Sequence, residues 1–406
     1  MDYSWVSVDA RTGVILADLP LLDVDKIKRS ISRYDSATAS LPLAPPPAGW
    51  ELATREGGAV MVLLGDATPI WGGIVTQAPR GSGDTVEMSL ATVESYFDRR
   101  YVGDVTYTQV GQNAIVADLI ARYVATGPRG GLPIRAVQVG GAGTLRDRTY
   151  TDASDKTVYS CLTELAAVDG GPEWTVEWEW QHDPERITPV LYVGARIGAA
   201  VNAGLAPVST FDLPGCVIEA TVFRDYSAGK GANVVVAVSS AVADVRPQSP
   251  AQVAADDGRP TYEHRWTPST SITEVSTLTA HARSALATLA PGAVAVTLSA
   301  NAGTAPRLGI DWVLGDDVGY ALGGLETDPR THMVDVYDDL WSDIWSDTWG
   351  GTFLRREKAL VNPDGRDSVP AFPGGIAGAA RAIGWELTLG ATPIVTPILA
   401  TQGASA

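Results

Sequence analysis

The N-terminal part of the chain alternates short apolar runs with turn-forming residues. Apolar runs at positions 5–8 and 14–17 flank the segment 9–13, which has the length and composition of a β-hairpin loop. Further strand candidates follow at regular spacing, at positions 27–33, 37–41, 60–64, 70–75 and 86–90. Many short strands separated by turns predict an antiparallel sandwich or barrel over residues 1–105.

The apolar residues change to a helical period in the next block. Positions 113–124 carry them at intervals of three and four residues, which predicts an amphipathic helix. A second helix is predicted over about 155–168, with Ser154 or Asp155 as its N-cap. Cys161 falls on the apolar face of this second helix, and we therefore interpret it as a core residue.

A strand rich in tryptophan follows the second helix. Its large apolar residues alternate with polar ones and are Trp174, Val176, Trp178 and Trp180. Glu177 and Glu179 share the opposite face, where a spacing of about 7 Å is compatible with the carboxylate pair of a glycosidase. We interpret both instead as the solvated face of an edge strand, whose partner strand lies at 187–193. Residues 106–205 are thus predicted to form a mixed helix and strand subdomain.

Strand-like segments return between residues 206 and 335, at positions 217–224, 234–238 and 294–298. One further helix interrupts them: Ser271 and Glu274 form a capping-box signature ahead of it, and Pro291 and Gly292 end it. The pattern predicts a second β-rich domain that carries a helix.

Residues 336–406 are predicted to form an Asp/Trp-rich segment and a C-terminal extension that packs back on the chain or contacts neighbours, with a strand candidate at 385–389. The triplet Trp-Ser-Asp recurs there with a period of four, which on a helix places Trp341, Trp345 and Trp349 in one stripe. We favour burial of this stripe in an interface with the same or a neighbouring subunit. A sugar-stacking surface and an irregular loop are the alternatives.

The composition fits a folded chain of several domains. Its 406 residues exceed the usual size of a single hydrophobic core, and 45% are hydrophobic against 19% charged. The formal net charge is −17 at pH 7, without a run of basic residues, which argues against a surface for nucleic acid or anionic membranes. We also expect no membrane insertion and no secretion signal, because the sequence lacks the apolar stretches that either requires. Two cysteines, Cys161 and Cys216, are too few for a disulfide framework.

Catalytic and metal-binding motifs are missing from the sequence. It contains no Gly-x-Ser-x-Gly elbow, no His-Glu-x-x-His zinc motif and no phosphate-binding Gly-x-x-x-x-Gly-Lys loop. The histidines share no spacing that would bring them to one site; they are His182, His264, His281 and His332. We therefore predict no catalytic, cofactor-binding or metal-binding residues, no cofactor and no enzymatic activity.

Several segments, in their order along the chain, carry a family resemblance. They are residues 27–43, Ile70-Trp-Gly-Gly-Ile-Val75, and residues 95–102, 162–171, 224–236 and 308–318. In order and spacing they resemble the hub proteins of phage tails, which include the minor tail proteins of actinobacterial siphophages and the central baseplate hub of contractile phages. The first three are similar to the opening strands and the exit of the first barrel in these hubs. The others are similar to their second domain and second barrel.

The resemblance spans roughly residues 1–325 and implies a mainly β, α+β fold with two tube-like antiparallel β-barrel domains and a mixed α/β subdomain. It implies a homotrimer that forms a pseudo-sixfold ring, continues the tail tube and provides a channel for ejection. The implied partners are distal tail or tube proteins, the tape-measure protein and tip fibre or receptor-binding proteins, and DNA would pass without specific binding. The protein would be made in the host cytoplasm and reside in the virion, at the tail tip.

Two other functions are open on the sequence. A receptor- or glycan-binding module at the tail tip is motivated by the twelve tryptophans and by the stripe of Trp341, Trp345 and Trp349. A tail-associated cell-wall hydrolase is the second alternative, and it would be expected to carry a recognisable catalytic domain after the hub.

Overall fold

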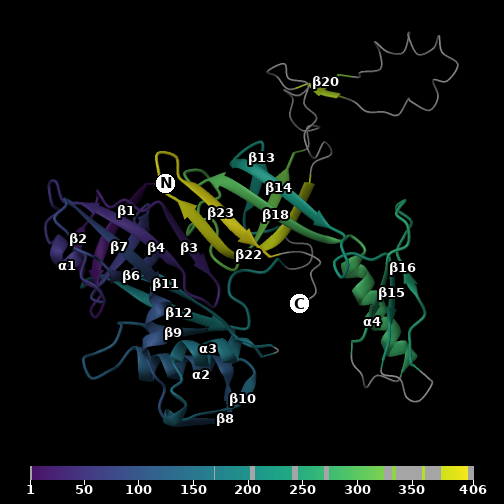
Figure 1. Ribbon diagram of the computed structural model, residues 1–406, viewed down its shortest axis with the longest axis horizontal. Coiled ribbons are helices and arrows are strands. Elements are labelled where there is room, and N and C mark those ends of the chain that lie inside the picture. Colours follow the sequence, from purple (N-terminus) through teal and green to yellow (C-terminus); the bar gives the residue numbers. More distant parts are fainter. Residues whose placement is uncertain are drawn as a thin grey trace.

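The computed structural model describes most of the chain. The described residues are 2–168, 170–201, 206–239, 246–268, 274–323, 332–334, 359–361 and 376–400. As the sequence predicts, this part of the chain is mainly β with a few helices (Figure 1). Two large sheets share a core, and a mixed unit of helices and strands packs against the first sheet. A small unit with one long helix lies at the end of a long strand pair (Figure 1).

The first sheet has six antiparallel strands in the order β2-β1-β5-β6-β7-β4. Their bounds are Tyr3–Asp9 (β1), Ile15–Asp18 (β2), Ser36–Pro42 (β4), Ala59–Gly65 (β5), Thr68–Gln77 (β6) and Thr85–Thr92 (β7), and a short helix, α1, covers Trp50–Ala53. The predicted hairpin is confirmed as β1 and β2. Four of the further strand candidates are confirmed as β4 to β7.

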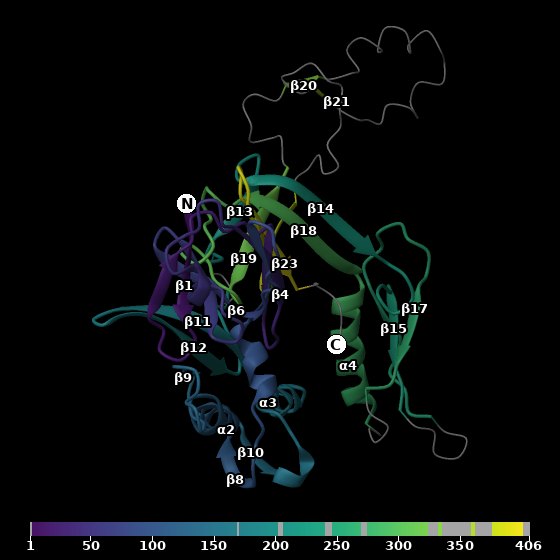
Figure 2. The ribbon, with the colours of Figure 1, turned by 60° about the vertical axis from the view of Figure 1, so that its left-hand side comes forward.

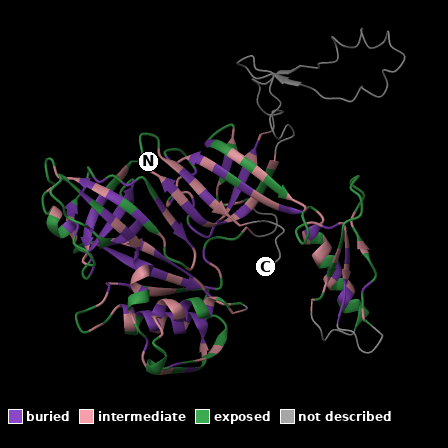
Figure 3. Cartoon of the chain, viewed as in Figure 1, coloured by how far each residue is buried: buried purple, intermediate pink, exposed green. Residues whose placement is uncertain are grey.

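Strand β5 shows why this sheet has no solvated face at its centre. Met61 and Leu63 belong to a core shared with the second sheet, whereas Val60, Val62 and Leu64 belong to a core shared with the mixed unit. All residues of the strand are buried, and buried positions, in purple, predominate in the strands of this sheet (Figure 3). The continuous apolar run at this position is therefore that of a central strand with two dry faces.

The second sheet has seven strands in the order β13-β19-β22-β23-β18-β14, with β3 paired to β22. Their bounds are Lys26–Ser30 (β3), Thr210–Leu213 (β13), Val217–Asp225 (β14), Ala293–Asn301 (β18), Asp317–Leu322 (β19), Ile376–Thr388 (β22) and Ile394–Leu399 (β23). The long strand β22 pairs with β19 through its first half and with β3 through its second half. The strand candidate at 385–389 is thus the end of β22.

Strand β3 ties the two large sheets together. Its pattern predicts a strand, and a strand forms, but it pairs with the distant β22 and places Ile27 opposite Leu387. Trp71 of the first sheet donates a hydrogen bond from Nε1 to the Lys28 carbonyl oxygen at 3.1 Å. A local apolar pattern predicts such a strand but not a partner that lies far away in the sequence.

Aromatic rings fill the core between the two large sheets. Trp5 meets Trp71 edge to face, with ring centroids 5.9 Å apart, and Phe211 meets Trp312 in the same way at 5.7 Å. Trp385 of β22 is buried in the same core. Edge-to-face packing places the positive ring edge on the negative face of its neighbour, so these contacts add direction to apolar burial.

The mixed unit contains a three-stranded and a two-stranded sheet with helices between them. Its strands are Val105–Gly111 (β8), Arg135–Val139 (β9), Leu145–Tyr150 (β10), Glu173–His182 (β11) and Glu185–Gly194 (β12). Its helical segments are Val93–Arg99 (η1), Gln112–Leu119 (α2), Ile120–Val124 (η2), Asp152–Ser154 (η3) and Val158–Ala166 (α3). Both predicted helices and the predicted tryptophan-rich strand pair are confirmed.

Helix α3 begins later than the sequence predicts. Its N-cap is Thr157, whose side-chain oxygen accepts a hydrogen bond from the Ser160 N–H at 3.1 Å. Ser154 belongs to a separate short turn, and Asp155 has a φ of +47°, in the left-handed region, so the predicted cap at these two residues is wrong. Cys161 is fully buried in the core, as predicted.

The small unit consists of three short strands and the long helix α4 (Figure 2). Their bounds are Val234–Ala237 (β15), Gln252–Val253 (β16), Glu263–Trp266 (β17) and Val275–Leu289 (α4). Two further short strands form a separate pair, His332–Val334 (β20) and Ala359–Val361 (β21). Gly292 ends the helix as predicted, because its N–H bonds to the Leu289 carbonyl oxygen at 3.0 Å. Glu274 is the N-cap residue but makes no side-chain cap bond, and Ser271 lies outside the described residues.

Gly72 in β6 allows a close approach between the first sheet and the mixed unit. A Cβ at this position would lie 2.2 Å from the Trp178 ring. We expect Gly72→Ala to force the two sheets apart and to lower the free energy of unfolding by about 1–3 kcal/mol. Chemical denaturation followed by tryptophan fluorescence measures the change. Gly81→Ala is the matched control, because a Cβ there meets nothing within 4 Å, and equal losses in the two variants would contradict this packing.

Candidate functional site: arginine junctions and a free sheet edge

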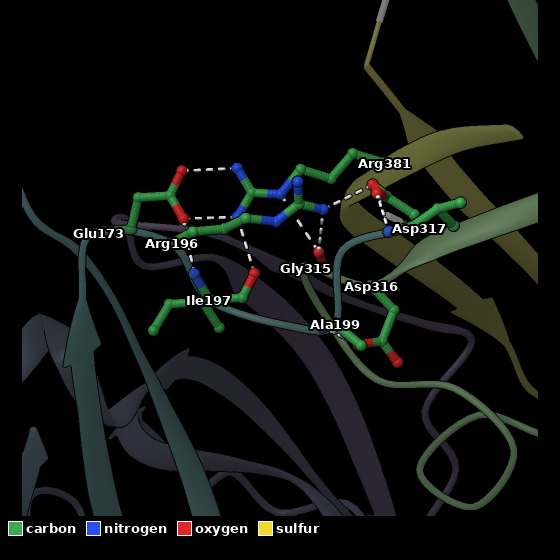
Figure 4. A network of polar contacts seen from close by, with 9 residues as sticks. Glu173, Arg196, Ile197, Ala199, Gly315, Asp316, Asp317 and Arg381 are labelled. Carbon is green, nitrogen blue, oxygen red and sulfur yellow. Dashed lines mark hydrogen bonds and ion pairs between the residues drawn. The ribbon is translucent and has the colours of Figure 1, made fainter. Parts of the chain in front are cut away.

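Arg381 in β22 joins the second sheet to the mixed unit (Figure 4). Its guanidinium donates to both carboxylate oxygens of Glu173 at the start of β11, with Nη1 and Oε1 2.6 Å apart. It also donates to the carbonyl oxygens of Ile197 at 2.8 Å and Gly315 at 3.2 Å. A two-pronged pair with two further acceptors fixes the orientation as well as the distance of the joined elements.

The chain segment that leaves β12 is held by two neighbouring carboxylates. Arg196 donates to Asp317 at 2.5 Å, and the N–H of Val201 donates to the other oxygen of Asp317 at 2.8 Å. The N–H of Ala199 donates to Asp316 at 2.6 Å. Burial opposes ionisation of Asp317, but the Val201 N–H and the Arg196 guanidinium hold its pKa below the usual value. The segment therefore enters the second sheet along a fixed path.

Two glycines make this path possible. Gly198 and Gly315 have φ values of +81° and +96°, in the left-handed region. A Cβ on Gly198 would lie 2.1 Å from the carbonyl carbon of Gly315, closer than any side chain can come. Only glycine combines an unstrained positive φ with the absence of a Cβ. The junction therefore depends on the path of the backbone as well as on charged side chains.

Arg29 in β3 forms a second junction with β11. It is only 4% exposed, and it donates to Glu177 Oε2 at 2.8 Å, to Thr175 Oγ1 at 2.8 Å and to the Val176 carbonyl oxygen. Burial disfavours the Arg29 cation, yet the carboxylates of Glu177 and Glu94 raise its pKa, so the guanidinium stays charged. A buried cation with several acceptors can occupy this place only when β3 and β11 are correctly aligned.

Glu177 lies on an edge strand and its side chain is about one third exposed, but its carboxylate also has a partner that the sequence does not predict. Its carboxylate is one half of the Arg29 junction, because β3 from another sheet covers this part of β11. Glu179 accepts hydrogen bonds from Arg135 at 2.6 and 2.8 Å and is about one third exposed. The alternation predicts which strand face the two carboxylates share, but it cannot show that a basic residue from β3 comes to lie against one of them.

The residues considered for chemistry have structural surroundings. Cys161 and Cys216 are unpaired and buried, and burial raises the pKa of each thiol to about 11, which keeps both protonated near neutral pH. His182 stacks on Trp180, and its ring centroid lies 6.0 Å from that ring. The described residues contain no group of three or more histidine, cysteine or acidic side chains placed to hold a metal ion.

The predicted interface stripe of Trp341, Trp345 and Trp349 lies outside the described residues. Its burial in an interface thus stays a prediction. In the described ranges, no helix has both the length and the apolar character needed to cross a membrane.

Strand β14 is an edge strand of the second sheet and carries exposed apolar side chains. It pairs with β18, and no strand of the described chain pairs with its other side. Ile218 is 54% exposed and Phe223 is 58% exposed. We call Ile218, Phe223 and the unpaired backbone of β14 the β14 edge. Such an edge can accept a strand from another chain through backbone hydrogen bonds. The sequence predicts this strand but not its position at the end of a sheet.

Comparison with solved structures finds tail proteins, two of them from prophages, that align with this chain over nearly their whole length. The tail protein from Neisseria meningitidis MC58 aligns with a TM-score of 0.50 and 13% identity, over 98% of this chain and 97% of that chain. The 43 kDa tail protein of prophage MuSo2 from Shewanella oneidensis has a TM-score of 0.47 and 10% identity, over 98% of each chain. A prophage tail protein from Listeria monocytogenes EGD-e has a TM-score of 0.41 and 9% identity, over 97% of this chain and 94% of that chain.

The first of these likenesses shows a shared fold, and the two lower scores carry no argument. No protein-family model and no curated protein matches the chain. The chain thus has the fold of a phage tail protein over nearly its whole length, and the resemblance found in the sequence is confirmed at the level of fold.

We expect the Arg381 junction to act as a coupled pair. Arg381→Met should lower the free energy of unfolding by about 2–3 kcal/mol, because the partly buried Glu173 carboxylate loses its partner. Glu173→Gln should cost a similar amount, and the double variant little more, which gives a coupling energy of about 1–3 kcal/mol in a double-mutant cycle. Lys26→Met is the control: its pair with Glu386 is exposed and screened by solvent, so its loss should change stability far less than Arg381→Met does. If the stability losses of the two single variants add up in the double variant, Arg381 and Glu173 are not coupled, and the junction is excluded.

Asp317 should make the junction sensitive to acid. Because its pKa is lowered in the folded chain, its ionised form stabilises the fold above the ordinary aspartate pKa of about 3.9, and this contribution is lost as the pH falls through the folded-state pKa. We therefore expect Asp317→Asn to be less stable than the natural chain at about pH 6 and the difference to shrink below about pH 4. Urea unfolding across this range measures it, with Glu219→Gln as the exposed control. If the stability difference between Asp317→Asn and the natural chain does not change with pH, the lowered pKa of Asp317 is refuted.

Proposed function

We propose that the chain is a structural, non-enzymatic subunit of a phage tail and serves as the hub at the tail tip. Three copies would close into a pseudo-sixfold ring that continues the tail tube and connects it to the tip proteins. The observation that carries the proposal is the likeness in fold, across 98% of this chain, to a tail protein. The proposed location is the virion, after synthesis in the host cytoplasm.

The presence of two large sheets in one chain supports the ring. Three copies would contribute six sheets, which is the number needed to match a tube of sixfold symmetry. We retain the blocks 1–105, 106–205, 206–335 and 336–406 as the proposed domain plan. The structure adds that β3, β22 and β23 complete the second sheet, so residues outside 206–335 contribute to the second tube-like domain.

The junctions support a rigid subunit. A collar under load must keep the angle between its sheets, and apolar packing alone allows sliding because it has little directionality. Arg29 and Arg381 bind acceptors on β11 with defined geometry and come from two strands of the second sheet. Each copy would therefore enter the ring with the mixed unit and the second sheet held in one relative orientation.

The charge of the chain supports a channel. DNA and the tape-measure protein would pass through the ring during ejection, and a lumen with few basic residues offers no counterion-releasing contacts to phosphate. The net charge of −17 favours this passage without specific binding. The further proposed partners are distal tail or tube proteins above the ring and tip fibre or receptor-binding proteins below it.

The β14 edge is the proposed contact between neighbouring copies. Rings close through head-to-tail contacts between two different surfaces, so an unpaired strand on one copy can extend a sheet of the next. Exposed Ile218 and Phe223 would become buried in such a contact.

We expect the purified chain to form trimers, either alone at high concentration or on adding the neighbouring tube protein. Phe223→Asp should shift the population to monomers, because it places a charge on a surface that would be buried when the ring forms. Sedimentation velocity measures the distribution, and negative-stain images of the assembled sample should show a ring around a central hole.

Leu145→Asp provides the matched control, since Leu145 is 57% exposed on β10, outside the proposed contact. Circular dichroism should show that both variants are folded. A natural chain that stays monomeric in both conditions would reject the hub. Trimers unaffected by Phe223→Asp would reject the β14 edge alone.

A further inference from the structure

A pocket opens where the first sheet meets the mixed unit, at the end of β6. Its volume is about 800 Å³. The buried side chains of Ile74 and Leu132 line it, together with the exposed arginines Arg11, Arg99 and Arg129. The arginines come from three separate segments: the β1–β2 turn, the last turn of η1, and the loop after η2. The pocket is therefore a product of the tertiary fold.

The charge of this pocket is opposite to that of the chain. Among the described residues that line it, three are arginines and one, Asp98, is acidic, whereas the chain as a whole carries −17. Asp98 already accepts a hydrogen bond from Thr157 Oγ1 at 2.9 Å. Within the described chain, none of the three guanidiniums makes a hydrogen bond or an ion pair with a protein acceptor. Their donors are free to receive a ligand.

The turn that carries Arg11 is held in place. Asp9 Oδ1 accepts hydrogen bonds from the backbone N–H groups of Arg11 and Thr12, each at 3.0 Å. The Arg11 guanidinium lies beside the opposite loop, since a Cβ built on Gly130 would be 3.3 Å from its Nε and Nη2. The Arg11 guanidinium thus lies next to the loop that carries Arg129.

Two hydrogen bonds fix the loop that carries Arg129. Arg100 Nη2 donates to the Thr126 carbonyl oxygen at 2.8 Å, and the Leu132 N–H bonds to the Val124 carbonyl oxygen at 3.0 Å. Gly130 has a φ of +88°, which lets the loop turn back toward the pocket. A bound anion would therefore meet arginines on segments whose positions are already set by other contacts.

We propose that this pocket binds a short acidic peptide segment that also carries an apolar side chain. Its carboxylates would accept paired hydrogen bonds from Arg11, Arg99 and Arg129, whose planar forks match that geometry. Its apolar side chain would lie on the buried floor beside Tyr34 and Tyr96, which also line the pocket. This ligand site is independent of the ring and of the β14 edge.

A peptide suits the pocket better than a nucleic acid does. A long polyanion would extend beyond the pocket over a chain of strongly negative charge, whereas two or three carboxylates fit within the arginine cluster. The rings of Tyr34 and Tyr96 also offer apolar surface that phosphate groups do not use. The chain itself contains a stretch of this chemistry, residues 338–349, in which four aspartates alternate with tryptophan and other apolar residues.

A labelled synthetic peptide of residues 338–349 is the probe, with binding to the full chain followed by fluorescence anisotropy. To keep the chain's own stretch from competing, the measurement is repeated on a chain with Asp338→Asn, Asp339→Asn, Asp343→Asn and Asp347→Asn. Saturable binding is expected to weaken about tenfold with each of Arg11→Ala, Arg99→Ala and Arg129→Ala. Arg129→Lys should give an intermediate loss, because it keeps the charge and removes the fork.

Two controls make the result specific. Arg265→Ala changes an exposed arginine on β17 and should leave binding unchanged. A peptide with its four aspartates replaced by asparagine should not bind. The proposal is overturned if neither chain binds the peptide, if the arginine variants bind as well as the natural chain, or if a single-stranded oligonucleotide binds more tightly in the same buffer and loses that binding in the same variants. None of these outcomes depends on whether the chain forms a trimer.

Discussion

The burial of the first sheet on both faces is the constraint on which the rest of the structure depends. Its central strands β5 and β6 have no solvated side, so one face requires the second sheet and the other requires the mixed unit. A sheet with two apolar faces cannot be stable in water when either cover is removed. The chain therefore folds as a stack in which the sheet formed by the N-terminal residues is the middle layer.

Apolar burial brings these layers together, but the polar junctions decide how they are oriented. The Arg29 guanidinium is almost completely removed from water, and it keeps its charge because side-chain and backbone acceptors of β11 surround it. A shift of β3 along β11 would leave a buried cation without acceptors, which costs far more than the loss of a few apolar contacts. Arg381 applies the same restriction at Glu173, the first residue of β11. Two such points fix a relative orientation that one point would leave free to rotate.

The sequence predicts the strands and helices better than it predicts their partners. Alternation and helical periods depend on neighbouring residues, and β5, α2, α3 and β11 form where those patterns predict them. The pairing of β3 with β22 and the contact of Arg29 with Glu177 join residues far apart in the chain, and no local pattern carries that information. The cap of α3 was missed for a local reason, because Asp155 takes a left-handed conformation that a list of cap-forming residues does not reveal.

Arginine has two different roles in this acidic chain, and the difference follows from what surrounds each guanidinium. At the junctions, carboxylates and carbonyl oxygens surround the cation. Its charge is therefore compensated within the protein, and these contacts hold two layers together. At the pocket, three arginines from separate segments share the lining with one carboxylate, and their guanidiniums have no protein acceptor within the described chain. Hydrogen bonds nevertheless hold the segments that carry Arg11 and Arg129 in place. Arginines that have no protein acceptor and share one pocket are best explained by a ligand that supplies the missing negative charge.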